Sequence, residues 1–211
     1  MSSGYEHRRD EAYGSAWELA WHQLPVARLE EIAHSTNSIF DGRTFIIKVL
    51  DSKATVDVLT KSVDCDLPEH DRFLSILILH FLNGDHRATG PTEWVLFRQL
   101  PGGESFHSAF QERVVRKLAV AFSERPVALA QAGRSLEGRV EDFGGTTVVL
   151  DFLPLLPVRV TVWQGDDEIP GNATMLFPAS AARLLPTEDF AEVGAVVLAA
   201  LQRAVRVSTD Q

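Results

Sequence analysis

An apolar residue recurs at every fourth position along one stretch of this chain, and this pattern constrains the fold more than any other feature. The stretch covers residues 92–122 and begins with an extended segment that carries Trp94. A turn at 101–103 follows, and after it come the apolar residues Phe106, Phe110, Val114, Leu118 and Phe122. Residues four apart lie on one face of a helix, so the series predicts a helix over 106–122 that packs against a core.

Three further segments predict main helices. Over 10–23, Trp17 and Trp21 lie one turn apart, which is typical of core anchors. Residues 69–83 are apolar on almost every side, which indicates a helix central to the core. The last helix, 188–205, has Thr187 as an N-cap and acidic residues in its first turn, where they complement the helix dipole.

Alternating apolar residues and turn dipeptides predict the strands. Asp41-Gly42 and Gly144-Gly145 are hairpin signals, each flanked by apolar residues that alternate with polar ones. Asp151 and Arg159 are expected to pair across adjacent strands. The fold class is therefore α+β, with an antiparallel β-meander and hairpins packed against four main helices. We expect a single domain over 10–206, with flexible termini at 1–9 and 207–211.

Composition excludes several classes of protein. The chain has 211 residues, of which 45% are hydrophobic and 23% charged, as in ordinary globular proteins. A net charge of −9 repels a phosphate backbone and argues against nucleic-acid partners. The apolar runs are too short to span a membrane, and the first residues lack the apolar region of a signal peptide, so we expect a cytoplasmic protein. The single cysteine, Cys65, excludes an internal disulfide and an all-cysteine metal site.

The composition of two segments, 94–110 and 163–189, predicts a ligand-binding cleft between them. Trp94, Phe106 and Trp163 would supply apolar walls and Arg98 an anion contact, the mixture usual in ligand pockets. His80 and His107 are candidate ligands for a flat tetrapyrrole; the alternative for His80, whose side chain is expected to point inward, is a neutral core histidine bonded to a carbonyl.

Carboxylates are densest near the C-terminal end. Asp166, Glu168, Glu188 and Asp189 offer the hard oxygen ligands that magnesium or calcium prefer. The competing interpretation is that the first two belong to a solvated turn and the last two cap a helix.

Six ordered blocks carry a family resemblance over about residues 12–205. They are AWELAW, ILHFLNG, TEWVLFRQLPGG with the Phe-rich helix after it, VTVWQGDDEIP, TMLFPASAARLLPTED and the terminal helix. Together they resemble the uncharacterised family labelled domain of unknown function three-seven-eight-six, found mainly in anaerobic bacteria and archaea. Some members of that family look like fusions or neighbours of iron–sulfur or corrinoid-linked proteins, whereas this chain has no cysteine cluster. The blocks also contain Gly102 and Gly103.

The first functional hypothesis is a small-molecule, cofactor or partner-binding accessory domain, and the resemblance places such a domain in redox or one-carbon metabolism. One alternative is a scaffold or assembly protein. Another is a metal-dependent hydrolase that uses Asp166, Glu168, Glu188 and Asp189 to activate water. The identity of any cofactor and the oligomeric state stay open at this point.

Overall fold

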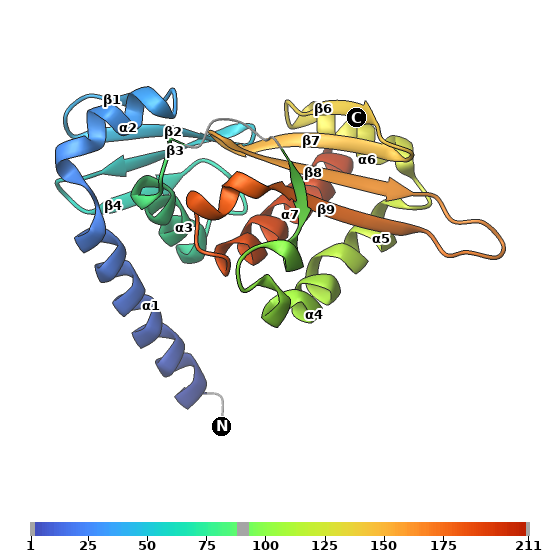
Figure 1. Cartoon of the computed structure of the whole chain (residues 1–211), viewed down its shortest axis with the longest axis horizontal. Coiled ribbons are helices and arrows are strands. Elements are labelled where there is room, and N and C mark those ends of the chain that lie inside the picture. Colours follow the sequence, from blue (N-terminus) through green and yellow to red (C-terminus); the bar gives the residue numbers. More distant parts are fainter. Residues whose placement is uncertain (1–2, 88–92, 210–211) are drawn as a thin grey trace.

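A computed structural model describes residues 3–87 and 93–209, and its N-terminal half contains a four-stranded antiparallel sheet (Figure 1). The alternating side chains Phe45, Ile47 and Val49 are fully buried, as the sequence pattern predicts. The first hairpin turns at Asp41, whose carboxylate accepts the backbone N–H groups of Arg43 and Thr44 at 2.9 and 2.7 Å. The strand order is β1 (Ile39–Phe40), β2 (Thr44–Val49), β3 (Ser52–Asp57) and β4 (Ser62–Cys65).

Two helices precede this sheet. Helix α1 (Ser3–Gln23) begins earlier than the residue 10 expected from its apolar pattern, and its N-terminal end points away from the rest of the molecule in Figure 1. Trp21 is buried, and its ring lies edge to face with that of Trp17 at 5.7 Å between centroids, so the tryptophan pair is a core anchor. A 3-10 turn (Val26–Arg28) then leads into α2 (Leu29–Ser35).

Helix α3 (Arg72–Asn83) runs through the centre of the core. Every side chain from Leu74 to Leu79 is buried, in agreement with its apolar sequence. The helix starts later than the expected residue 69 because Asp71 is the N-cap: its carboxylate accepts the backbone N–H groups of Phe73 and Leu74.

The second sheet has five antiparallel strands in the order β5-β9-β8-β7-β6. Both faces of its central strands are largely buried. Asp151 was expected to pair with Arg159, but it lies opposite Pro157 and pairs with Arg139 instead. The strands are β5 (Trp94–Leu96), β6 (Arg139–Asp142), β7 (Thr146–Leu153), β8 (Leu156–Trp163) and β9 (Asn172–Pro178).

Helices α5 and α6 pack against this second sheet, and α7 packs against α6 and the π-helix. In the view of Figure 1, α4 and α5 lie below the strands, whereas α7 rises to the C-terminus beside β6. The predicted helix 106–122 is present, although it is divided into a 3-10 turn, an α-helical turn, a π-helix and a final α-helix. The helices are α4 (His107–Phe110), the π-helix (Gln111–Val115), α5 (Arg116–Phe122), α6 (Pro126–Ser135) and α7 (Asp189–Thr209), with 3-10 turns at Phe97–Gln99, Gly103–Phe106 and Ala179–Arg183.

A backbone hydrogen bond joins the two sheets. The N–H of Leu50, which directly follows β2, donates to the carbonyl of Phe152 in β7 at 3.0 Å. Buried side chains from both sheets and from α3, α5 and α7 form one continuous hydrophobic core. The α+β class is confirmed. Within 3–87 and 93–209, no helix is both long enough and apolar enough to span a membrane.

Candidate functional site

A pocket of about 210 Å³ lies between the helical stretch 106–114 and the first half of α7. We call it the α4–α7 pocket. Its walls are mainly apolar, and three charged side chains, from Arg113, Glu188 and Glu192, also line it. The full lining is Phe106, Ala109, Phe110, Arg113, Val114, Glu188, Ala191, Glu192 and Ala195.

The turn before α4 sets the position of one wall. Gly102 adopts a φ of +75°, a conformation that glycine reaches without strain. Gly103 is buried, and a β-carbon on it would collide with the carbonyl oxygen of Phe97. The hydroxyl of Thr187 donates to the carbonyl of Pro101 at 2.7 Å, which ties this turn to the segment just before α7. The hydrogen bond therefore ties the start of the stretch 106–114 to the start of α7, the two segments that form the walls of the pocket.

Phe110 forms the floor of the pocket and is held by an aromatic cluster. Its ring stacks on that of Phe97, with centroids 4.3 Å apart and an angle of 8°, and lies 6.1 Å from that of Phe177. On the α7 side, a β-carbon on Gly194 would lie 2.7 Å from Cε2 of Phe110. Glycine at this position lets the helix approach the ring closely, so the floor has little freedom to move.

The π-helix places Arg113 and Val114 on the pocket wall. In an α-helix of about 3.6 residues per turn, residues four apart drift by about 40° at each step, so a strict fourth-residue stripe turns away from the core. The wider π turn offsets that drift. Phe110, Val114, Leu118 and Phe122 are all at most 2% exposed, whereas Phe106 is 44% exposed. π-helical turns occur frequently at functional sites.

Glu192 gives the pocket an unusual carboxyl group. Burial raises the pKa of Glu192 above its ordinary value, and the negative charges of Asp71 and Asp189 raise it further. Glu188 and Arg113 are exposed at the edge. The pocket thus presents apolar walls, a carboxyl that gains a proton more readily than usual, and one charge of each sign.

This environment predicts a pH-dependent effect of Glu192→Gln. A raised pKa means that the stability linked to Glu192 is fully present below the pKa of the unfolded chain, ordinarily 4.5, and is lost as the pH rises through the folded-state value. The glutamine variant should therefore melt at a higher temperature than the wild type at neutral pH, and the difference should shrink as the pH falls to 4.5. Thermal unfolding followed by circular dichroism measures this difference. Glu188→Gln, an exposed position on the same edge, is the control and should change the melting temperature little; an equal effect in both variants would contradict the role of burial.

His80 and Asp189 form a pair next to this pocket. Nδ1 of His80 lies 2.7 Å from a carboxylate oxygen of Asp189, and the two side chains are only 24% and 16% exposed. The pair connects the last turn of α3 to the first turn of α7. His80 is therefore half-buried and bonded to a carboxylate. The sequence had suggested either ligand binding or a bond to a backbone carbonyl.

The predicted metal site is not assembled. Asp166 and Glu168 lie in the loop between β8 and β9, where the Asp166 carboxylate accepts the N–H groups of Glu168 and Ile169 at 2.9 and 2.7 Å. These hydrogen bonds hold the pKa of Asp166 below its ordinary value. Asp189 is instead paired with His80 and Glu188 lines the pocket. Among the described residues, no group of three or more His, Cys, Asp or Glu side chains is placed to hold a metal ion.

Other residues predicted to bind a ligand lie outside the pocket. Arg98 is exposed on its 3-10 turn, and Trp163 lies against Gly145 at the end of β8. Nδ1 of His107 is buried and has no hydrogen-bond partner among the described residues. Phe106 and Glu188 are thus the members of the predicted set that meet in the pocket.

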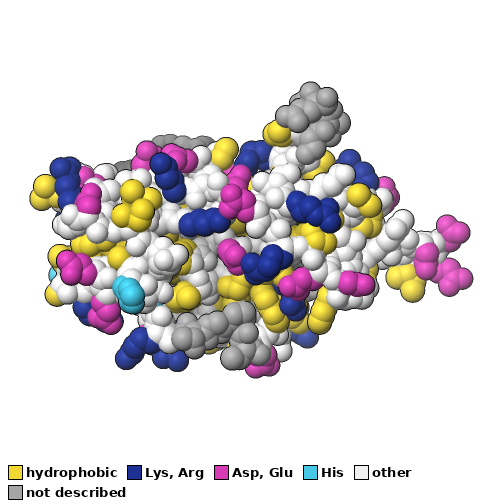
Figure 2. Space-filling view, turned by 90° about the horizontal axis from the view of Figure 1, so that it is seen from above, with side chains coloured by type: hydrophobic (Ala, Val, Ile, Leu, Met, Phe, Trp, Pro, Cys, Tyr) yellow, Lys and Arg dark blue, Asp and Glu magenta, His cyan; other side chains and the backbone are white. Residues whose placement is uncertain are grey.

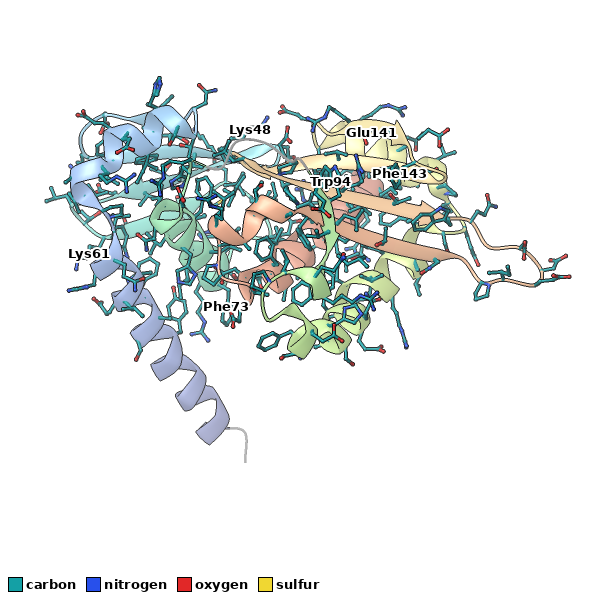
Figure 3. All side chains as sticks on the ribbon, viewed as in Figure 1. Lys48, Lys61, Phe73, Trp94, Glu141 and Phe143 are labelled. Carbon is teal, nitrogen blue, oxygen red and sulfur yellow. The ribbon has the colours of Figure 1, made fainter. Side chains whose placement is uncertain are left out.

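Trp94 belongs to a separate cluster on the opposite face of the second sheet, as Figure 3 shows. The guanidinium of Arg159 lies 4.3 Å from the centre of the Trp94 ring and 4.9 Å from that of Phe143. It also pairs with Glu141 at 3.0 Å. The cation is thus held between two aromatic rings and a carboxylate, an arrangement that stabilises the sheet face, while its Nε is buried and has no hydrogen-bond partner among the described residues.

Residues 28–200 match the family model described as Domain of unknown function (DUF3786). The chain belongs to this family. The DUF3786 segment contains every residue that lines the α4–α7 pocket, as well as His80 and Asp189. No curated protein and no solved structure matches the chain.

Sequence reasoning missed Arg113 and Glu192. Both lie on helix faces that look solvated in a single sequence, and their place in a pocket follows from the packing of α7 against the stretch 106–114. The strict fourth-residue spacing is the one local signal that something other than a regular α-helix lies there, because an α-helix does not keep such a stripe buried.

Proposed function

We propose that this DUF3786 chain is a binding module for a small molecule and that the α4–α7 pocket is its binding site. The observation that carries the proposal is the combination of a preformed apolar pocket with a carboxyl group, Glu192, whose pKa is raised by burial. Apolar walls with a few converging polar groups and a perturbed titrating residue are the usual features of ligand sites.

The chemistry of the pocket suggests the class of ligand. Phe106, Phe110 and Val114 favour an apolar body, while Glu188 and Glu192 favour a group that donates hydrogen bonds, such as an amine or an amide. Arg113 adds a single cationic contact at the edge. A small molecule with an apolar body and one polar end satisfies all of these groups.

The volume limits the size of the ligand. Pockets for drug-sized ligands span about 300–1,000 Å³, and about 210 Å³ lies below that range. A tetrapyrrole held by His80 or His107 is too large for this pocket, and Nδ1 of His80 is already bonded to Asp189. Because the family resemblance suggests redox or one-carbon metabolism, small metabolites of those reactions are the first compounds to test.

Filling the pocket should abolish binding. Ala195 is exposed and lines the pocket, so Ala195→Phe places a ring in the opening without disturbing the core. A library of small amines, amides and metabolites, screened by ligand-observed NMR, should give compounds that bind the wild type and lose at least about tenfold in affinity with this variant. Ala179→Phe, an exposed alanine away from the pocket, is the matched control and should bind as the wild type does. Equal binding to all three proteins would contradict the assignment of the site.

A further inference from the structure

A second, more open hollow of about 730 Å³ lies between α5 and the C-terminal part of α7. Four cationic side chains line it, and we call it the basic groove. Between them lie apolar side chains, including Val120, which is 85% exposed. The cations are Arg116, Lys117, Arg125 and Arg206.

The charge of this groove is opposite to that of the chain as a whole. The chain has 29 acidic and 20 basic residues, yet the residues that line the groove include four cations and no carboxylate. Arg116 pairs with Glu112 one turn away at 3.0 Å, an exposed pair that contributes little to stability. The combination of exposed cations and an exposed valine fits a partner that is acidic and partly apolar.

The loop between β8 and β9 has the complementary chemistry. We call residues 164–171 the acidic loop. Asp166, Asp167 and Glu168 are exposed there, and Ile169 is 67% exposed. The loop projects beyond the end of the sheet in Figure 1, and Figure 2 shows acidic and apolar side chains together at its tip.

The tip of the acidic loop is held in one shape by its own hydrogen bonds. The N–H of Asp166 donates to the carbonyl of Ile169 at 2.9 Å, and the Asp166 carboxylate accepts two further N–H groups of the loop. Asp166 is therefore used within the loop, whereas Asp167 and Glu168 present their charges outward. A tip with a preset shape loses less conformational entropy when it binds.

The loop and the groove lie at the same end of the molecule. A β-carbon on Gly171, at the base of the loop, would lie 2.5 Å from Oγ of Ser123, which directly follows α5. A two-fold axis near this end can therefore bring the loop of each copy to the groove of the other. In such a dimer the loop–groove contact occurs twice, and no loop or groove is left for a third copy.

We propose that the acidic loop of one copy of this chain docks in the basic groove of a second copy, and that the reciprocal contact completes a two-fold dimer. Asp167 and Glu168 meet the cations of the groove, and Ile169 packs on Val120. Because the charges are exposed, the dimer is weak and sensitive to salt, which screens such pairs.

Charge reversal on either surface tests this dimer. Asp167→Lys with Glu168→Lys gives a basic loop facing a basic groove. Arg116→Glu with Lys117→Glu leaves two acidic and two basic side chains in the groove, so the groove loses the net positive charge that attracts the acidic loop. Sedimentation of the wild type from micromolar to high-micromolar concentration should show a monomer–dimer equilibrium that weakens with added salt. Each double variant should raise the dissociation constant by at least about tenfold. The control, Arg98→Glu with Glu93→Lys, reverses exposed charges elsewhere and should leave the dimer intact.

Mixing the two double variants gives the sharper result. In the mixed dimer, the acidic loop of one variant meets the unchanged basic groove of the other, and the basic loop meets a groove without net positive charge. One contact is therefore attractive again and the other is no longer repulsive. An equimolar mixture should therefore dimerise although neither variant does so alone, while circular dichroism shows that both are folded. A wild type that stays monomeric, a dimer that survives the reversals, or a mixture that stays monomeric would each overturn the proposal.

Discussion

Replacing Phe110 by alanine should lower the free energy of unfolding by about 3–5 kcal/mol. Phe110 is 2% exposed, and its ring contacts Phe97, Phe177 and the helix face at Gly194. Removing the ring leaves a cavity among groups that are themselves held in place, so the site cannot collapse to fill it.

Urea denaturation of the wild type and the variant measures this change. Phe106→Ala is the matched control, because it removes the same side chain one turn earlier in the same stretch, at a position that is 44% exposed. The control should lose less than about 1 kcal/mol of stability, since surface substitutions usually have small effects. Similar losses in both variants would contradict the assignment of Phe110 as a rigid floor.

Gly103→Ala should also destabilise the protein strongly, by about 3 kcal/mol. The added β-carbon would collide with the backbone oxygen of Phe97, and a backbone atom cannot move aside as the end of a flexible side chain can. The turn that carries Phe106 would have to shift, so the variant should also lose affinity for ligands of the α4–α7 pocket.

Gly14→Ala is a control that should change the free energy of unfolding in the opposite direction. Gly14 lies within α1, and a β-carbon there would meet no atom within 4 Å. Because alanine favours the helix over glycine, this variant should gain up to about 1 kcal/mol. Thermal and urea unfolding of both variants check the two signs, and a Gly103→Ala protein as stable as the wild type would contradict the packing described for this turn.

Periodic apolar patterns predicted most of the fold. The helices at 106–122 and 188–205 and the central position of α3 follow from residues that repeat with a helical period, and β2 follows from strict alternation. The start of α3 was misplaced because capping by Asp71 is decided by the geometry of its carboxylate. The pairing of Asp151 was wrong because strand register depends on both strands at once.

The candidate site was predicted only in part, because a pocket is a product of packing between distant segments. Two pocket residues were named from the sequence: Phe106 as an apolar wall of the expected cleft, and Glu188 as one of the dense carboxylates near the C-terminal end. Glu192 resembles any solvated helix residue until α3 and the stretch 106–114 enclose it. The carboxylates of Asp166 and Asp189 looked available for a metal, but one is used by its own loop and the other by His80.

The central claim is that the α4–α7 pocket binds a small molecule, and methyl NMR tests it most directly. A compound that binds the protein should shift the methyl signals of Ala109, Val114, Ala191 and Ala195, which line the pocket, and leave those of Ala27 and Ala179 unchanged. Ala195→Phe should remove these shifts. If bound compounds perturb methyl groups elsewhere while those of the pocket stay unchanged, or if no compound of the tested classes binds, the account is contradicted.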